Sequence, residues 1–328
     1  GLVLDLRSNP GGLLNESVSL CNLFIDKNQE VVSTKGKIKD WEKSYKTSKE
    51  PLDKELPLAV LINQSSASAS EIVSGTMQDL DRAVIIGKKS FGKGLVQQTR
   101  KLSYNSQLKV TVAKYYTPSG RCIQALDYAH RNDDGSVGKV ADSLKTAFQT
   151  KNGRIVYDGG GVDPDILVDR DAYAEIVGSL VSKQLIFDYA TAFVLENDTI
   201  DVPGDYKITD ELYEDFVAYL SDKDYEYETH TEKELAELIE QAEDEYSDFK
   251  VDLEELQKKL LSYKEDDIHK YQSQISELIL SELMARYYYQ EGRVIASLAD
   301  DVVLDEAISV LNDSDRYESI LLGNPDAK

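Results

Sequence analysis

The spacing of apolar residues in the first half of the chain predicts short buried strands separated by helices. Apolar runs at residues 2–6, 56–62 and 83–87 are each followed by a turn rich in glycine, asparagine or serine, as is typical of buried strands. Residues 13–24 and 69–81 instead place their apolar side chains at helical spacing. Strands that alternate with helices in this way predict an α/β fold.

The rest of the first half is patterned less evenly. Residues 95–116 predict further strands, because apolar and polar side chains alternate over residues 108–112. The lysine-rich residues 30–55 are weakly patterned, with a short strand expected at Val31 and Val32. Residues 127–160 are polar and rich in turn-forming residues, so we expect a loop there.

The second half of the chain has the apolar spacing of helices. One apolar stripe covers residues 235–249 and another covers residues 268–279, which we expect to stop near Gly292. Thr231 and Glu234 match the capping-box pattern at the start of the first stripe. No apolar run reaches the roughly 18 residues that a membrane-spanning helix needs. We therefore predict a helical domain without a membrane span.

Charge separates the same two halves. Of the 328 residues, 1–195 contain 25 basic and 23 acidic side chains, whereas 196–328 contain 12 and 37, which concentrates the net charge of −23 in the second segment. We predict a first domain over 1–170, a join over 171–195 and an acidic helical domain over 196–328. An acidic surface repels phosphate backbones, which argues against a nucleic-acid partner. Because the chain opens inside a strand-like run, we expect it to be part of a longer protein.

Cysteine and histidine are too sparse for several kinds of site. The chain has two cysteines and three histidines, and the histidines are far apart in the sequence. This excludes a disulfide-rich scaffold and argues against a zinc enzyme. Cys21 falls on the apolar face of a predicted helix, so we expect it in the core.

Candidate chemistry lies in the serine-rich turn at residues 65–70, between a predicted strand and a predicted helix. A serine at a helix N-terminus is well placed for nucleophilic attack but needs a base. His130, the one histidine of the first half, lies in the expected loop. A lysine acts as a base when burial keeps it neutral. Lys93, between two glycines, is the candidate, and we expect it to be largely buried and within hydrogen-bond reach of the serine.

Simpler interpretations exist for the same residues. Serines in such turns usually cap helices and do nothing more. Residues 87–93 also match the first seven positions of a phosphate-binding loop, but Gly94 stands where that motif needs serine or threonine. The segment after Gly94 predicts a strand, whereas the motif opens a helix. Asp5 and Arg7 are expected to be structural, either as an ion pair or through turn contacts at a strand end.

Five segments together resemble the carboxy-terminal processing, or tail-specific, serine proteases of the Ser-Lys type. They occur in the order of that family and span residues 1–166: DLRSNPGG (5–12), SASASEI (66–72), FGKGLVQ (91–97), YYTPSGR (115–121) and GVDPDI (161–166). The resemblance implies a ClpP/crotonase-like α/β protease core, followed here by the acidic α-helical domain. The family usually has a PDZ domain upstream of this core, and this chain begins downstream of its place.

The resemblance also implies roles for individual residues. The nucleophile corresponds to Ser68, the general base to Lys93 and a third residue, which orients the base, to Gln97. Two backbone amides are implied to bind the oxyanion. One is that of Ala69, and the other is that of Gly11 or Gly12, with both alternatives open.

The function implied by the resemblance is endopeptidase cleavage of protein substrates near accessible C-terminal tails. No cofactor or metal is implied, and the location is periplasmic or otherwise extracytoplasmic. The helical domain is a candidate surface for forming homo-oligomers. Two alternatives stay open: a catalytically silent peptide-binding scaffold of the same fold, and a nucleotide-binding protein.

Overall fold

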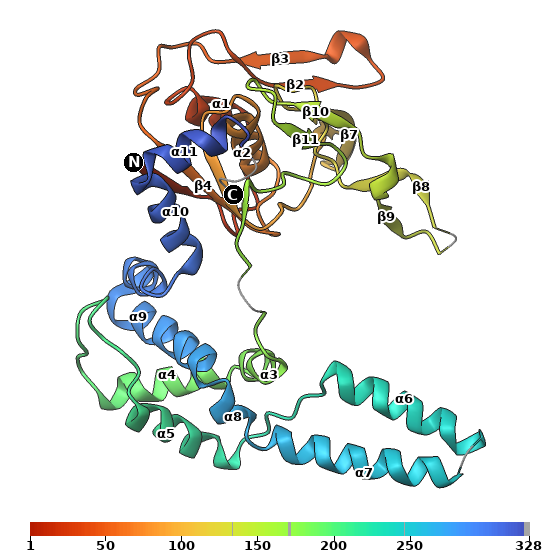
Figure 1. The fold of residues 1–328 in the computed structure, drawn as a ribbon, viewed down its shortest axis with the longest axis vertical. Coiled ribbons are helices and arrows are strands. Elements are labelled where there is room, and N and C mark those ends of the chain that lie inside the picture. Colours follow the sequence, from red (N-terminus) through yellow and green to blue (C-terminus); the bar gives the residue numbers. More distant parts are fainter. Residues whose placement is uncertain (133, 170–171, 246, 325–328) are drawn as a thin grey trace. The chain divides into compact units, whose positions relative to one another are not determined.

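The computed structural model describes residues 1–132, 134–169, 172–245 and 247–324, which form two compact units (Figure 1). The first unit comprises residues 1–170 and 302–328, and the second comprises residues 171–301. Each unit has its own hydrophobic core. None of the helices in the described ranges is long and apolar enough to cross a membrane. The α/β core and the helical domain that follows it confirm the predicted fold class.

The main sheet of the first unit is parallel and has four strands. Its order is β1 (Leu2–Asp5), β4 (Leu58–Ile62), β5 (Val84–Gly87) and β12 (Ile166–Leu167). All five residues of β4 are buried. This is the burial expected of a parallel strand that is covered on both faces, and it explains why the run is apolar throughout.

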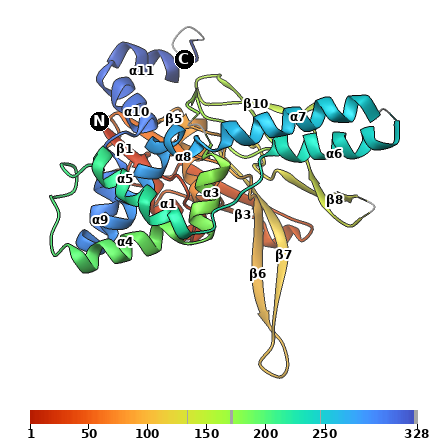
Figure 2. The ribbon, with the colours of Figure 1, turned by 90° about the horizontal axis from the view of Figure 1, so that it is seen from below.

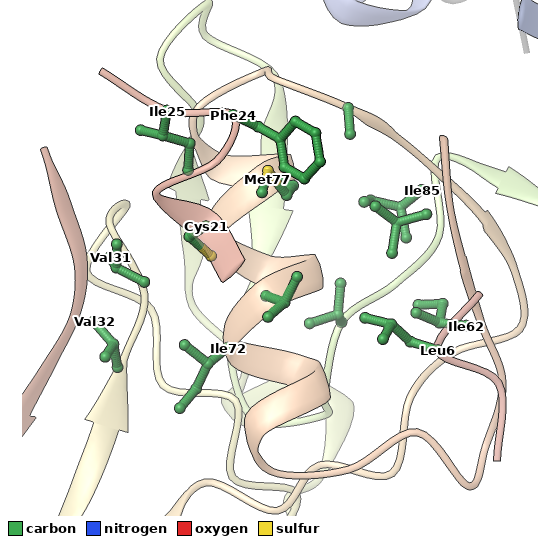
Figure 3. Packing of buried hydrophobic residues seen from close by; sticks show 14 of the residues in the cluster. Leu6, Cys21, Phe24, Ile25, Val31, Val32, Ile62, Ile72, Met77 and Ile85 are labelled. Atoms are coloured by element: carbon green, nitrogen blue, oxygen red, sulfur yellow. The ribbon is translucent and has the colours of Figure 1, made fainter. Parts of the chain in front are cut away.

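Two helices, α1 (Leu14–Cys21) and α2 (Ala69–Asp79), cover one face of this sheet. Figure 3 shows their side chains packed together, with Met77 of α2 beside Phe24 and Ile72 of α2 on the side of Val31 and Val32. Cys21 is fully buried in this cluster, and burial raises the pKa of its thiol to about 12. The expectation that Cys21 is a core residue is therefore confirmed.

The opposite face of the sheet is covered by the last two helices, α10 (Val302–Asn312) and α11 (Ser314–Leu321). Ala307, Val310 and Ile320 pack there against the remaining side chains of β4 and β5. The hydroxyl of Tyr317 accepts a hydrogen bond from the Leu58 N–H at 3.0 Å. These helices belong to the first unit, although their charge groups them with the acidic segment, because a doubly buried strand needs cover on both sides.

A second sheet is antiparallel and carries a long hairpin. Its order is β3 (Lys43–Lys46), β2 (Glu30–Lys35), β7 (Gln107–Tyr116) and β6 (Leu95–Lys101). The β6–β7 hairpin extends well beyond its neighbour β2 and away from the body of its unit (Figure 2). The strands expected at residues 95–116 and at Val31 and Val32 are thus confirmed.

The loop expected at residues 127–160 is wrong. This segment forms two small hairpins, β8 (Leu126–Arg131) with β9 (Val137–Lys139) and β10 (Ala147–Gln149) with β11 (Ile155–Tyr157), and a 3₁₀ turn, η2 (Asp142–Leu144). Buried polar contacts, which apolar alternation in the sequence does not reveal, hold part of this segment in position. The guanidinium of Arg154, which is largely buried, contacts Asp81 at 2.6 Å and Asp165 at 2.5 Å.

The second unit is helical. Its elements are α3 (Glu175–Ser182), α4 (Leu185–Glu196), α5 (Asp210–Tyr219), η3 (Leu220–Asp222), α6 (His230–Glu245), α7 (Ser247–Lys264), α8 (Asp267–Lys270) and α9 (Gln272–Ser297). The range predicted as the join, 171–195, contains α3 and most of α4, and several side chains of these helices, among them Ile176, Leu180 and Tyr189, belong to the core of this unit.

Two local predictions in the helical unit need correction. The capping box that opens α6 uses Thr229 and Glu232, because the Thr229 N–H donates to Glu232 and the Glu232 N–H donates to the Thr229 hydroxyl at 3.2 Å. The expected pair, Thr231 and Glu234, has the same spacing but begins two residues later than the pair that is used. The last stripe does not stop near Gly292, since α9 continues to Ser297 after a break in helical geometry at Tyr289.

Candidate active site

The serine-rich turn adopts the strand–turn–helix geometry that the sequence predicts. Ser68 directly precedes Ala69, the first residue of α2, and the turn follows β4. The backbone of Ser68 has φ 58° and ψ −113°, a conformation that costs a non-glycine residue free energy. Strained serines of this kind occur where a nucleophile must project from a tight turn.

The glycine-rich turn after β1 packs directly on the serine turn. The carbonyl of Asn9 accepts hydrogen bonds from the Ala67 N–H and the Ser70 hydroxyl, each at 3.0 Å. Gly11, at φ +91°, lies so close that an added Cβ would stand 2.5 Å from the Ala67 oxygen and 2.6 Å from the Ala69 nitrogen. Only glycine fits this close backbone approach.

Two backbone amides near Ser68 remain available to a ligand. Ala69, as the first residue of α2, has no partner for its N–H within the helix. The Gly11 N–H donates to the Asn9 side chain at 2.9 Å, whereas no acceptor is recorded for the Gly12 N–H among the described residues. A Cβ at Gly12 would meet nothing within 4 Å. Free amides beside a serine are suited to binding an oxyanion.

Residues 91–94, which we call the lysine turn, pack closely against neighbouring segments because Gly92 and Gly94 carry no side chain. A Cβ at Gly92 would lie 2.3 Å from the Ala125 Cβ, and one at Gly94 would lie 2.6 Å from the Gln124 nitrogen. The Phe91 N–H donates to the Ser66 carbonyl at 3.0 Å. The turn that carries Lys93 is therefore pressed between a neighbouring segment and the serine turn, which explains its Gly-Lys-Gly pattern.

The buried carboxylate of Glu71 joins the two turns. Its Oε2 accepts the backbone N–H of Ser68 and that of Lys93, each at 2.8 Å. Its Oε1 accepts the Gly92 N–H and the Ser90 hydroxyl, each at 2.6 Å. The backbone nitrogens of Ser68 and Lys93 hence lie no further apart than twice 2.8 Å.

The electrostatics of Glu71 follow from this position. Burial raises the pKa of the Glu71 carboxyl, and the four hydrogen bonds that it accepts offset only part of that rise. A buried acceptor that serves four donors is costly to replace, because any donor left without a partner keeps its full desolvation penalty. Glu71 is thus an integral part of the geometry around Ser68.

The lysine side chain itself is not where the sequence analysis expects it. Lys93 is exposed, and within the described ranges no hydrogen bond joins its ammonium to the Ser68 hydroxyl or to Gln97. The expectation that this lysine is largely buried is wrong for this structure. The turn holds its backbone in place, but the described residues do not cover its side chain.

Gln97 lies on β6, four residues after Lys93. A β-bulge between Val96 and Gln97 shifts the register with β7, and the Gln97 side chain is exposed. The structure therefore brings together Ser68, Ala69, Gly11 and Gly12, places the backbone of Lys93 beside them, and leaves the side chains of Lys93 and Gln97 apart from the serine.

Other candidate interpretations are decided by local structure. Leu95, two residues after Lys93, begins strand β6 where a phosphate-binding loop must open a helix, so the match at residues 87–93 is coincidental. The expected ion pair of Asp5 and Arg7 is present at 2.7 Å. His130 belongs to strand β8 and not to a loop. The described residues contain no group of three or more side chains placed to hold a metal ion.

Sequence analysis assigned no role to Asn9 or Glu71, although both lie within the quoted motifs. A signal for Glu71 was present: Ser68-x-x-Glu71 has the capping-box spacing at the start of a predicted helix. The structure shows that this glutamate also binds the lysine turn, which no local pattern indicates.

Two protein-family models match the chain. Residues 1–129 match peptidase family S41, and residues 176–311 match the C-terminal helical domain of probable PDZ-proteases. The carboxy-terminal-processing protease of Bartonella bacilliformis is 50% identical over 126 residues, which cover 38% of this chain and 29% of that protein. A probable CtpA-like serine protease of Staphylococcus epidermidis is 47% identical over 125 residues, covering 37% of this chain and 25% of that protein.

Solved structures include a related chain, the photosystem II D1 C-terminal processing protease. It is 31% identical, with a TM-score of 0.38, over 52% of this chain and 34% of the other. The chain thus spans between a quarter and a third of the length of these relatives.

Proposed function

We propose that the chain is the catalytic part of an endopeptidase, because residues 1–129 match the model of peptidase family S41 and resemble a carboxy-terminal-processing protease. It cleaves protein substrates near their C-terminal ends with Ser68 as nucleophile and Lys93 as base. The observation that carries this proposal is the Glu71 carboxylate, which binds the backbone of both residues through one oxygen atom.

In the proposed reaction, the Ser68 hydroxyl oxygen attacks the carbonyl carbon of the scissile peptide bond. Neutral Lys93 takes the hydroxyl proton and then gives it to the leaving amine, which breaks the carbon–nitrogen bond. Water next attacks the carbonyl carbon of the acyl-enzyme, and neutral Lys93 takes a proton from that water. The bond between this carbon and the Ser68 oxygen then breaks, and Lys93 returns the proton to the Ser68 oxygen. Gln97 orients the lysine side chain.

The oxyanion is proposed to lie between the amides of Ala69 and Gly12. Both N–H groups lack an acceptor among the described residues, whereas the Gly11 N–H is already bound to Asn9. Each such donor contributes about 3 kcal/mol to stabilising the transition state. Gly11 then serves by letting the turn approach Ser68.

The exposed lysine side chain is part of this proposal. Hydrogen bonds between catalytic groups are often absent without substrate and form in the bound complex. With its backbone held at Glu71, Lys93 needs only side-chain rotation to reach the Ser68 hydroxyl. A substrate lying across the turn would then exclude water from the pair.

The decisive experiment replaces each member of the pair. Ser68→Ala and Lys93→Ala should each abolish cleavage of an unstructured peptide with an apolar C-terminus, while circular dichroism shows the fold retained. The double variant should lose little more, because the two residues act as a unit. A Lys93→Ala protein that keeps about a tenth of the wild-type kcat would exclude the lysine as base, since a general base contributes roughly 10²–10⁴-fold.

A serine-reactive probe separates this proposal from a silent peptide-binding scaffold. The catalytic chain should be labelled at Ser68 and lose the label in Ser68→Ala. A folded chain that binds the peptide but takes no label would instead be a scaffold. Cleavage products should be identified by mass spectrometry, because cuts far from the C-terminus would contradict the proposed specificity.

Location and assembly are also proposals. The two sequence relatives named above are bacterial, one a carboxy-terminal-processing protease and the other a probable CtpA-like serine protease. By that likeness we propose an extracytoplasmic location, and we also propose self-association through the helical unit. Cell fractionation of the natural protein tests the first, and sedimentation velocity of the chain with and without residues 171–301 tests the second.

A further inference from the structure

A strongly basic surface lies on the two hairpins of the second sheet, outside the candidate active site. It consists of residues 35–46, at the β2–β3 connection, and residues 95–116, the β6–β7 hairpin. These two segments contain nine basic and two acidic side chains, and residues 95–116 contain no acidic side chain. We call them together the hairpin surface. The charge of this surface opposes that of the acidic segment 196–328.

The two hairpins form one continuous surface. The guanidinium of Arg100, on β6, stacks over the ring of Trp41 in the 3₁₀ turn η1 (Lys39–Trp41) at 5.6 Å. A Cβ at Gly36 would stand 2.3 Å from the Val112 oxygen, so the β2 end lies directly against β7. Lys37, Lys39, Lys101 and Lys109 are exposed, and no ion pair is recorded for any of these four in the described part of the chain.

Among the described residues, the β6–β7 hairpin is covered little beyond the contacts of Arg100 with Trp41 and of Val112 with Gly36. Every residue from 97 to 111 is exposed. Strand β2 pairs with residues 114–116 of β7, and residues 107–113 of β7 pair only with β6. A two-stranded ribbon of this kind is marginally stable by itself. Figure 2 shows it projecting from its unit, which places its tip roughly 20 Å beyond the paired region at the rise of a β-strand.

Apolar side chains stand at both projecting ends. Leu102 is 54% exposed and Tyr104 fully exposed at the tip of the β6–β7 hairpin, while Ile38 and Trp41 are 46% and 42% exposed in the β2–β3 connection. Each pair is flanked by lysines in the sequence. Both pairs stand at connections between strands, one between β2 and β3 and the other between β6 and β7, so the apolar side chains lie on protrusions.

The tip holds its tyrosine in a costly conformation. Tyr104 and Asn105 have φ values of 57° and 60°, the geometry of a type I′ turn, which favours glycine and asparagine. A tyrosine there is strained, and its ring makes no aromatic contact among the described residues. Residues held in such a backbone conformation are often found at functional sites, so Tyr104 is a candidate contact for an external partner.

We propose that the hairpin surface docks on an anionic lipid bilayer. Tyrosine and tryptophan favour the membrane–water interface, lysine side chains extend along apolar surface with the charge in water, and each basic residue near an anionic bilayer strengthens binding by about fivefold. Two separate protrusions with apolar ends and basic flanks suit a soft, flat, negatively charged surface. The acidic residues are concentrated in another segment of the sequence, residues 196–328.

Docking in this way orients the candidate site. Gln97 lies at the base of the projecting hairpin, and Lys93 lies just before it. Because β6 separates Lys93 from the tip, a bilayer at the tip stands one hairpin length, roughly 25 Å, from the turn that carries Lys93. The proposal does not depend on peptidase activity, because its test measures binding only.

The test uses the whole chain and vesicles of phosphatidylcholine with or without phosphatidylglycerol. Trp41 is the single tryptophan of the chain and reports on the surface itself. We expect co-sedimentation with the anionic vesicles only, a blue shift of the Trp41 emission on binding, and weaker binding as salt is raised. Binding to neutral vesicles with equal affinity, or binding without any change in Trp41 emission, would overturn the proposal.

Two variants and one control make the test specific. Tyr104→Gly removes the ring at a backbone position that glycine favours, so it should fold normally and bind at least about threefold more weakly. Replacing Lys37, Lys39, Lys101 and Lys109 by glutamine should weaken binding about fivefold for each lysine. The matched control replaces the exposed Lys27, Lys151, Lys258 and Lys259 by glutamine and should leave binding unchanged.

Other partners give different outcomes. If a heparin fragment binds with the same loss in Tyr104→Gly, the surface recognises a soluble polyanion and the bilayer proposal is wrong. If sedimentation velocity shows self-association that the four hairpin lysines control and that excludes vesicles, the partner is the acidic segment of another copy. An equal loss of vesicle binding in the control variant also contradicts the proposal.

Discussion

The carboxylate of Glu71 accepts the backbone N–H of Lys93 at 2.8 Å. These residues are separated by 22 positions in the sequence, and the same oxygen also accepts the N–H of Ser68. One buried side chain therefore sets the distance between the turn of the candidate nucleophile and the turn of the candidate base. Backbone contacts hold most of the residues around Ser68 in place, while the side chain of Lys93 is exposed.

Replacing Glu71 by glutamine should uncouple the two turns. The amide nitrogen of glutamine is a donor, so it leaves some of the four N–H and O–H groups without an acceptor. We expect the free energy of unfolding to fall by about 1–3 kcal/mol for one unsatisfied buried donor. We also expect kcat/KM to fall at least about a hundredfold, because small displacements of catalytic groups are costly.

The measurements are urea unfolding and peptide cleavage on the same preparation. Glu55→Gln, an exposed glutamate of the same unit, serves as the control and should change neither. A folded Glu71→Gln protein with wild-type kcat/KM would show that the carboxylate does not position the pair.

The two glycines after β1 should respond differently to alanine. Gly11→Ala places a Cβ within 2.6 Å of the Ala69 nitrogen at a φ of +91°, whereas Gly12→Ala meets no atom within 4 Å. We expect Gly11→Ala to lower kcat/KM at least about a hundredfold by displacing the oxyanion-binding amide. Gly12→Ala keeps its N–H and should stay within about threefold of wild type.

The pair is measured by steady-state kinetics after circular dichroism has confirmed folding. Equal activity of Gly11→Ala and wild type would mean that the close approach of this turn plays no part in catalysis. A large loss in Gly12→Ala would mean that the substrate needs the space beside that residue.

The dependence of the rate on pH distinguishes a lysine base from a histidine base. A lysine must lose its proton to act, so kcat/KM should continue to rise above the ordinary histidine pKa of about 6.5. His130→Ala should keep its activity, because the proposed base is Lys93 and His130 belongs to another element, strand β8. Chelators should have no effect on the rate.

The profile should be recorded for wild type and His130→Ala with and without a chelator. A rate that levels off near pH 6.5, together with loss of activity in a folded His130→Ala protein, would assign the base to histidine. The proposed roles of Ser68 and Lys93 would then have to be withdrawn.

The last helix should stabilise the protease unit through one hydroxyl. Tyr317 accepts the Leu58 N–H at 3.0 Å and lies 3.3 Å from the carbonyls of Leu58 and Arg82. Tyr317→Phe leaves a buried backbone donor unpaired, so the free energy of unfolding should fall by about 1–3 kcal/mol. Urea unfolding measures this, with the exposed Tyr263→Phe as the control. Equal stability of the two variants would show that this bond contributes nothing.

Sequence patterns alone determined the type and order of most core elements. Apolar runs located β1, β4 and β5, and helical spacing located α1 and α2, because the burial of a strand or helix repeats with a fixed local period. The motifs located Ser68, Lys93 and the glycine-rich turn for a different local reason, because a tight turn requires particular residues. The capping box of α6 shows the limit of local signals, because two overlapping threonine–glutamate pairs fitted the pattern and one was used.

Only the tertiary structure decided which distant groups meet. Three contacts join segments that share no sequence pattern. Glu71 binds the backbone of Lys93, Gly11 packs against the backbone of Ala69, and α10 and α11 cover the parallel sheet. The exposure of the Lys93 side chain belongs to the same class, because burial depends on what the rest of the chain places over a residue. The spacing of residues predicts which side chains a segment can bury, whereas the topology of the fold determines which other segment covers them.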